Sequence, residues 1–247
     1  MNTPRFFSST PLNSESTTLL TGSPARHMSK ALRMQPGDTV VLFDGSGCEY
    51  DAIINSVAKS AVELRTGIAR IPPTESSLEI ELWQGVSKGS RMDSVVQKAT
   101  ELGVMRIRPV LTKHGMVKLD AARADKRTEH WQEVAVSACE QSGRAVVPKI
   151  MLPIKLEAAL GALNKNDQAV MLVPGDYPAL GAAPLSGTSI ILIIGPEGGF
   201  SSGEEALAKS LGVTLGSMGP RILRTETAPL AALSILQCRY GDMGANH

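Results

Sequence analysis

The chain of 247 residues carries 25 Lys and Arg residues against 24 Asp and Glu residues, which gives a formal net charge of +1. This length allows one or two domains with a substantial core. The near balance of charge argues against a generally basic nucleic-acid binder, and the aromatic share of 4% argues against a surface that stacks many single-stranded bases. The longest aliphatic run, Ile190–Ile194, is too short for a membrane span, and the N-terminus has no apolar segment typical of a secretory signal. We therefore expect a cytoplasmic protein with no membrane partner.

Cysteine and histidine usage predicts no metal site. Cys48, Cys139 and Cys238 form no CxxC pair, which fits reduced thiols in a cytosol. The four histidines are scattered without the spacing of metal ligands and lie at His27, His114, His130 and His247.

Two local clusters of positive charge stand out from the balanced total. Residues 1–33 hold four cations against Glu15 alone, and these are Arg5, Arg26, Lys30 and Arg33. Residues 105–118 hold no acid, and their positive groups are Arg106, Arg108, Lys113 and Lys118, with His114 beside them. Either cluster is a candidate phosphate-contacting patch. For either one alone, solvated loop charge is the more common explanation.

The first part of the chain reads as a small β-rich domain. Short alternating segments at 39–43 and 51–54 are broken by glycines. Composition then changes at Ile71–Ser77, where two prolines precede small polar residues in the manner of a linker. We therefore predict one domain over residues 1–72 and a second over 73–247.

The second domain alternates strands with helices in chain order. Strands are predicted at 78–83, 107–111, 169–173, 189–194 and 213–215. Helices are predicted at 92–102, at 121–142, from Ser202, and from Thr225 or Thr227 to near the C-terminus. Residues 90–93 resemble a capping box at the start of the first of these helices. This alternation predicts an α/β domain with a mainly parallel sheet.

In such sheets, ligands bind beyond the carboxyl ends of the strands, and Gly195–Phe200 occupies that position. Its glycines let the backbone approach a ligand closely. The segment is neither a Walker A loop nor a GxGxxG motif, so a nucleoside triphosphate or a dinucleotide is poorly supported. Taken alone, a glycine-rich turn between a strand and a helix is more often structural than functional.

A second segment, Gly219–Ala228, places two arginines and a glutamate between a predicted strand and a predicted helix. Singly, Glu226 is explained as a first-turn acid that complements the helix dipole, and Arg224 as a surface ion pair. Together with the glycine-rich turn, this density of polar groups at strand ends favours a ligand site.

These two segments, GPEGGF and GPRILRTETA, resemble the 16S ribosomal RNA uridine-N3 methyltransferase family of the SPOUT (α/β-knot) superfamily. The likeness covers nearly the whole chain, because further motifs occur in the same order at 5–7, His27 with Leu32-Arg33, 88–89, 98–104 and 140–144. Ala31 and the stretch 218–220 depart slightly from the family pattern.

The resemblance implies a small PUA-like β-barrel for RNA binding, followed by a trefoil-knotted SPOUT methyltransferase domain. It also implies a homodimer that uses S-adenosylmethionine and acts on 16S rRNA of the small ribosomal subunit. By that likeness, the residues that bind the cofactor are Leu172, Val173, Pro174, Gly195, Glu197, Gly198, Gly199, Met218, Ile222, Leu223 and Arg224.

Methylation of uridine N3 requires loss of its imide proton and stabilisation of the resulting anion. Arg224 is the candidate for stabilising the anion, and Glu226 is the candidate base. Glu197 is a candidate for orienting the cofactor or the base. Because the donor is cationic, a dedicated base is not strictly required, and positioning supplies a large part of the rate.

The candidate RNA-binding residues are Arg5, Arg26, His27, Arg33, Lys88 and Arg91. For His27 a structural role packed on the barrel is equally compatible with the sequence. Gln141, Ser142 and Arg144 are expected to line either the site or the dimer interface.

Two alternative functions remain open. One is methylation of a ribose 2′-hydroxyl by the same superfamily, which the full-length match disfavours. The other is a non-catalytic rRNA-binding or ribosome-assembly protein, which would have no need of the second, glycine-rich half.

Overall fold

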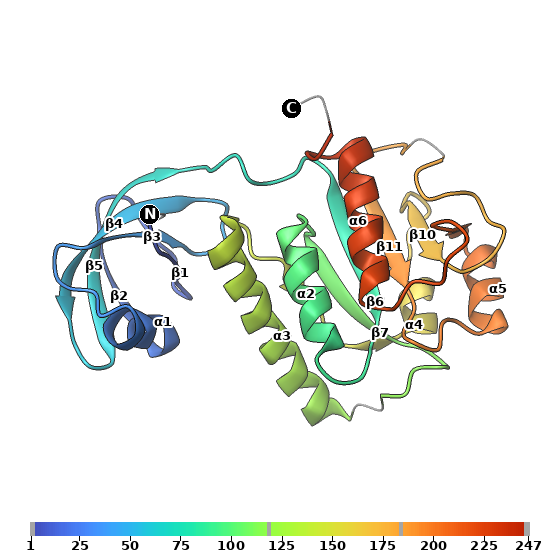
Figure 1. The fold of residues 1–247 in the computed structure, drawn as a ribbon, viewed down its shortest axis with the longest axis horizontal. Helices are drawn as coiled ribbons and strands as arrows, with labels where there is room; N and C mark the ends of the chain where they lie inside the picture. The colour runs from blue at the N-terminus through green and yellow to red at the C-terminus, as the bar shows by residue number, and fades with distance from the viewer. Residues whose placement is uncertain (1–2, 118–119, 183–184, 245–247) are drawn as a thin grey trace. The chain divides into compact units, whose positions relative to one another are not determined.

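The computed structural model describes residues 3–117, 120–182 and 185–244, and the chain forms two compact units, each with its own sheet (Figure 1). Unit 1 comprises Met1–Glu75 together with Cys139–Val147, and unit 2 comprises Ser76–Ala138 together with Pro148–His247. The second segment of unit 1 has no counterpart in the division at residues 72 and 73 that the sequence suggests.

Unit 1 is built on a curled five-stranded sheet of order β1-β3-β4-β5-β2, a PUA-like half-barrel. Its strands are β1 Arg5–Phe7, β2 Thr17–Thr21, β3 Thr39–Phe43, β4 Glu49–Val57 and β5 Ala61–Arg70. β1 and β3 are parallel, and the other neighbours are antiparallel. Side chains alternate along β4, where Ala52 and Ile54 are buried and Asp51 and Ile53 are exposed, so one face of the sheet makes the core.

A short helical segment that the sequence analysis did not predict follows β2. It consists of α1 Gly22–Arg26 and a π-helical turn, η1 His27–Ala31. Met28 on this turn is fully buried in the core of unit 1, which anchors the segment. The neighbouring polar side chains of Arg26, His27 and Lys30 are exposed.

The second segment of unit 1 supplies part of its core and a buried arginine that forms an ion pair. Cys139 and Ala145 pack with Phe43 in a small apolar cluster. Arg144 is only 2% exposed and its guanidinium pairs with Glu75 at 2.6 Å (Nη2 to Oε2). Arg144 is therefore a structural residue of unit 1, which corrects the expectation that it lines a ligand site.

Unit 2 contains a parallel sheet of order β12-β10-β11-β6-β7-β8, with β9 also paired to β7. Its strands are β6 Glu79–Gly85, β7 Arg106–Leu111, β8 Lys149–Ile150, β9 Ile154–Lys155, β10 Ala169–Leu172, β11 Ser189–Ile194 and β12 Thr214–Gly216. Every pairing in this sheet is parallel. The prediction of an α/β domain with a mainly parallel sheet is thus confirmed, and the carboxyl ends of these strands meet at one edge.

Helices cover both faces of this sheet. They are α2 Arg91–Glu101, α3 Ala121–Ser142, α4 Leu156–Gly161, α5 Ser202–Ser210 and α6 Thr227–Tyr240. α2 and α6 lie side by side over one face (Figure 1), while α4 and α5 pack against the face that carries Trp83 and Met171. Within the described residues, no helix is long and apolar enough to cross a membrane.

The starts of α5 and α2 differ in their side-chain caps. Ser201 and Glu204 form a complete capping box at the start of α5. Ser90, which precedes α2, makes no side-chain capping bond, so the capping box suggested at residues 90–93 is wrong. Arg91 follows Ser90 as the first residue of α2.

Candidate functional site

A cavity of about 660 Å³ lies at the carboxyl ends of the strands of unit 2. Its walls come from the residues that follow β10, β11 and β12, with Arg91 from the start of α2. All eleven residues that the resemblance assigns to cofactor binding line it, namely Leu172, Val173, Pro174, Gly195, Glu197, Gly198, Gly199, Met218, Ile222, Leu223 and Arg224. Glu226 lines it as well. The fold therefore brings together segments separated by about fifty residues of sequence, while their individual roles stay predictions.

The turn after β11 is held by close backbone approaches that only glycine permits. A Cβ on Gly85, the last residue of β6, would lie 2.4 Å from the backbone nitrogen of Pro196. A Cβ on Gly198 would lie 2.9 Å from Cβ of His114 and 3.0 Å from its carbonyl oxygen. The turn is thus packed between the end of β6 and the loop after β7. Packing alone therefore requires glycine at these two positions, whether or not a ligand binds.

His114 also bonds to this turn. Its ring Nδ1 lies 3.1 Å from the carbonyl oxygen of Gly198, and the backbone N–H of the neighbouring Lys113 donates to Oε1 of Glu204 at 2.8 Å. The loop after β7 is therefore fastened both to the glycine-rich turn and to the start of α5. The sequence analysis counted His114 and Lys113 only as part of a positive cluster.

A buried hydroxyl connects three of the segments around the cavity. The side chain of Thr225 donates to the carbonyl oxygen of Gly195 at 2.9 Å and accepts from Nε2 of Gln84 at 3.1 Å. The Ser87 hydroxyl lies 3.3 Å from it. Gln84, Ser87 and Thr225 are all buried. Sequence reasoning missed all three, because a buried Gln at the end of an apolar strand was the only signal and nothing in the sequence names its partner.

Three arginines line the cavity and differ in their surroundings. Arg91 donates to Oε1 of Glu197 at 2.8 Å and lies 3.7 Å from Oε2 of Glu226 (Nε to Oε2). Arg221 and Arg224 are exposed, and among residues 3–117, 120–182 and 185–244 no side-chain hydrogen bond or ion pair involves either of them. Their guanidinium groups are therefore available to an incoming ligand.

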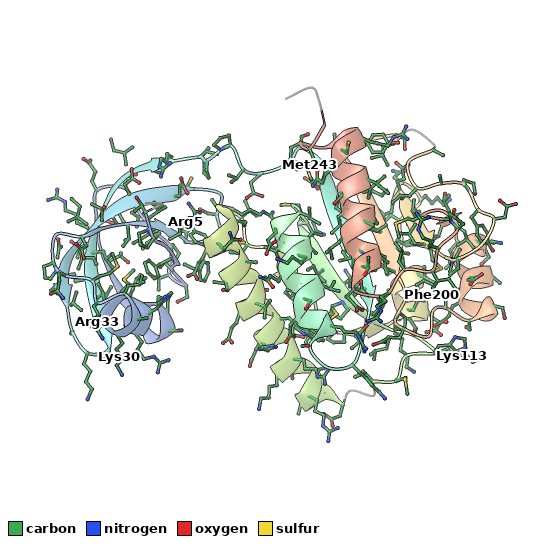
Figure 2. The ribbon with its side chains drawn as sticks, viewed as in Figure 1. Arg5, Lys30, Arg33, Lys113, Phe200 and Met243 are labelled. Carbon is green, nitrogen blue, oxygen red and sulfur yellow. The ribbon has the colours of Figure 1, made fainter. Side chains whose placement is uncertain are left out.

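Of the four predicted RNA contacts of unit 1, one is a cation held in an ion pair and three are exposed side chains. The Arg5 guanidinium pairs with the buried carboxylate of Glu49, stacks over the Phe43 ring at 5.1 Å, and is mostly buried. Arg26, His27 and Arg33 are exposed, and the His27 ring contacts Phe6 edge-on at 5.7 Å. Figure 2 shows Arg33 and Lys30 near each other at the α1 end of this unit. Arg5 is thus a structural residue, and both expectations for His27 have a basis in the geometry.

Two arginines of the second positive cluster share one acid. Arg108 donates to Oε1 of Glu81 at 2.9 Å and stacks over the Trp83 ring, and Arg106 lies 3.6 Å from Oε2 of the same glutamate. Lys113 is exposed, and Lys118 lies outside the described residues. A phosphate-contacting patch at residues 105–118 therefore stays a prediction.

Lys88, the remaining predicted RNA contact, is exposed in the loop before α2.

Within the part of the chain that the structure describes, no group of three metal-binding side chains is found.

Family models match both units of the chain. Residues 74–237 match the RNA methyltransferase domain, and residues 20–66 match the RNA methyltransferase PUA domain. The chain is 34% identical to ribosomal RNA small subunit methyltransferase E of Bacillus subtilis over 88% of each protein.

Two solved structures resemble the chain along nearly its whole length. One is a Legionella pneumophila protein in complex with the bound cofactor SAM, with 36% identity, a TM-score of 0.93, and coverage of 98% of this chain and 100% of that one. The other is a ribosomal RNA small subunit methyltransferase E from Neisseria gonorrhoeae bound to S-adenosylmethionine, with 36% identity, a TM-score of 0.92, and coverage of 98% and 99%.

Proposed function

Because the chain belongs to the ribosomal RNA small subunit methyltransferase E family, we propose that it transfers a methyl group from S-adenosylmethionine to N3 of a uridine in 16S rRNA. The observation that carries the proposal is that residues following β10, β11 and β12 line one cavity. Two arginines of this cavity, Arg221 and Arg224, make no side-chain ion pair among the described residues. The two similar structures named above hold this cofactor, which supports assigning it to the same place here.

The cavity fits the cofactor by size and by chemistry. Its volume of about 660 Å³ is in the range of small-molecule sites, roughly 300–1,000 Å³. Apolar side chains such as Leu172 and Leu223 offer surface to an adenine ring, while the carboxylates of Glu197 and Glu226 suit the positive groups of the ligand. Gly195, Gly198 and Gly199 carry no side chains, so the backbone of the turn can approach a ligand closely.

S-adenosylmethionine, when bound, supplies an electrophilic methyl group on a sulfonium. The residues of the chain prepare the other reactant. Arg224, with its exposed guanidinium, stabilises negative charge on O2 or O4 of the uracil and so lowers the pKa of the N3 proton. Glu226 at the same cavity accepts that proton, directly or through water.

The RNA is held by groups on both units. Arg26, His27 and Arg33 of unit 1 contact phosphates, and Lys88 does so in unit 2, since all four side chains are exposed. Affinity for rRNA should then fall steeply between 50 and 200 mM salt, in the usual pattern of counterion release. An affinity that does not change with salt would contradict these contacts.

We further propose that the protein acts in the cytoplasm as a homodimer whose chain threads the trefoil knot of its superfamily. α6 supports the dimer, because apolar residues surround it: Ala232, Leu233 and Leu236 are buried, while Leu230 and Ile235 on other sides remain half-buried. A helix that is apolar all round is typically enclosed by protein. Sedimentation velocity of the wild type and of Leu230→Asp tests this, with the variant expected to be monomeric.

The test of the reaction is chemical. Small ribosomal subunits that lack the modification are incubated with the protein and labelled S-adenosylmethionine, and the rRNA is digested to nucleosides for mass spectrometry. We expect label in 3-methyluridine. Label in a 2′-O-methyl nucleoside would show sugar methylation instead, and rRNA binding without cofactor affinity in calorimetry would show a non-catalytic protein.

A further inference from the structure

Arg91 joins two loops of the cavity that are distant in sequence. It is the first residue of α2, and its guanidinium contacts Glu197 in the turn after β11 and Glu226 in the loop before α6. The sequence separation of Arg91 and Glu197 is 106 residues. One side chain thus connects three segments that contribute to the same cavity.

The first turn of a helix favours negative charge, because the free N–H groups there carry a partial positive charge. The acid of this turn in α2 is Asp93, which contacts His130 and Trp131 of α3. The ion pairs of Arg91 are instead with Glu197 and Glu226, outside its own helix, which favours a role for Arg91 at these two acids.

The two carboxylates in turn depend on Arg91. Oε2 of Glu226 is buried and has no hydrogen-bond partner among the described residues, so the Arg91 guanidinium at 3.7 Å is the cation that offsets its desolvation. Glu197 approaches the other side of the same group at 2.8 Å. Without the cation, two like charges would face each other across the cavity.

We infer that Arg91 is a positioning residue of the methyltransferase: it fixes the glycine-rich turn against the loop before α6 and so sets the width of the cofactor cavity. The inference rests on the proposed function. It replaces the expectation, drawn from the sequence, that Arg91 contacts RNA phosphate. Arg221 and Arg224 are then the cavity arginines that meet the nucleic acid.

The two roles of Arg91 predict opposite results for Arg91→Gln. A phosphate contact predicts weaker rRNA binding, with a salt slope smaller by about one, and unchanged cofactor affinity. A positioning role predicts an unchanged rRNA salt slope and a cofactor affinity lower by about tenfold, a factor in the range for loss of a charge-assisted hydrogen bond. Arg91→Lys keeps the charge but not the fork that reaches two acids, so its cofactor affinity should be intermediate.

Calorimetry with S-adenosylmethionine and rRNA binding at several salt concentrations measure these two quantities. Arg123→Gln is the matched control, because Arg123 is an exposed arginine of α3 that pairs with Asp120 at 3.3 Å, and it should behave as the wild type. Cofactor affinity equal to wild type in Arg91→Gln, with a reduced salt slope, would overturn the inference.

Hydrogen exchange without cofactor tests directly whether Arg91 holds the two loops together. Amides of residues 197–200 and 221–226 should exchange faster in Arg91→Gln than in the wild type, while those of the β6 strand should not change. If Arg91→Gln fails to fold, Glu226→Gln is measured in the same way and should loosen the same two segments. Unchanged exchange in both segments contradicts the inference. Because this experiment is done without cofactor, its result does not depend on the proposed function. The proposed function is refuted by a different result, namely that the wild type binds no cofactor.

Discussion

The Thr225 hydroxyl donates a 2.9 Å hydrogen bond to the carbonyl oxygen of Gly195, and this bond fastens the loop before α6 to the turn after β11. The Thr225 hydroxyl oxygen also accepts from Nε2 of Gln84 at 3.1 Å. One side chain of ordinary size thus holds the end of β6 and two walls of the cavity in one arrangement.

Thr225→Val should destabilise the protein and widen the cavity. The substitution keeps the shape of the side chain but removes the partner of the Gly195 carbonyl oxygen and one of the two acceptors of the Gln84 amide, which keeps its bond to the Gly85 carbonyl, at a cost of about 2 kcal/mol. Urea unfolding measures this, and calorimetry should show weaker cofactor binding. Thr214→Val, on an exposed side chain of β12, is the control and should leave both quantities unchanged.

Gly85→Ala should prevent the turn after β11 from closing. The added Cβ would lie 2.4 Å from backbone nitrogen of Pro196, which cannot move aside as a flexible side chain can. We expect a loss of about 3 kcal/mol in unfolding free energy, or failure to fold. Gly187→Ala, where a Cβ meets nothing within 4 Å, should be nearly neutral. Equal stability of the two variants would show that the close approach is absent.

Arg224→Ala should slow methyl transfer with cofactor bound. Removing a preformed donor to a developing anion lowers the rate about 10²-fold. Because the uridine N3 proton then has to be lost without that help, the rate should continue to rise at a pH where the wild-type rate has levelled. Single-turnover measurements with saturating cofactor test both expectations, and a near-normal rate in this variant contradicts the role.

The three cysteines should react with an alkylating reagent in the order of their exposure. Cys139 is buried, and desolvation raises the pKa of its thiol to about 12, so almost none of it is thiolate at neutral pH. Cys238 is exposed and should react first with iodoacetamide, followed by Cys48. Peptide mass spectrometry should find Cys139 modified only when unit 1 opens. Early modification of Cys139 would mean that this part of unit 1 is not packed as described.

Glu140 should make the folded protein less stable as pH rises. Burial raises the pKa of this carboxyl above its ordinary value, so the folded state holds its proton more tightly than the unfolded chain does. Its contribution to stability is present below about the unfolded pKa and is lost as pH rises through the folded pKa. Glu140→Gln retains an acceptor for the Phe7 N–H. In urea unfolding, its stability relative to the wild type should increase between pH 4 and pH 7.

Periodicity and turn signals located the longer elements of unit 2 but missed the short ones, β8, β9 and α4. The predicted helix 121–142 and strand 189–194 have the observed bounds, since long amphipathic and short β-branched segments carry strong patterns. The helical segment α1–η1 was missed, because its ten residues hold few apolar side chains and only Ala25 and Met28 reach the core. Local patterns are weak where two buried residues determine an element.

Residue composition at strand ends, aided by the family resemblance, identified the residues of the cavity but not their connections. Arg91 and Arg5 each read as free cations in the sequence, yet their partners lie 106 and 44 residues away. Nothing in the sequence indicated that Gln84 and Thr225 are partners, because their pairing exists only after the sheet has formed. Such long-range pairings are set by topology, which spacing along the chain does not encode.

The composition of unit 1 from two separate stretches has a consequence for synthesis on the ribosome. Glu75 finds its buried partner Arg144 only after 69 further residues have been added, a delay of roughly 3 to 14 s at typical rates of bacterial elongation. Until then Phe43 of the half-barrel lacks its apolar partners Cys139 and Ala145. The nascent chain therefore cannot complete its first unit before much of its second has been synthesised.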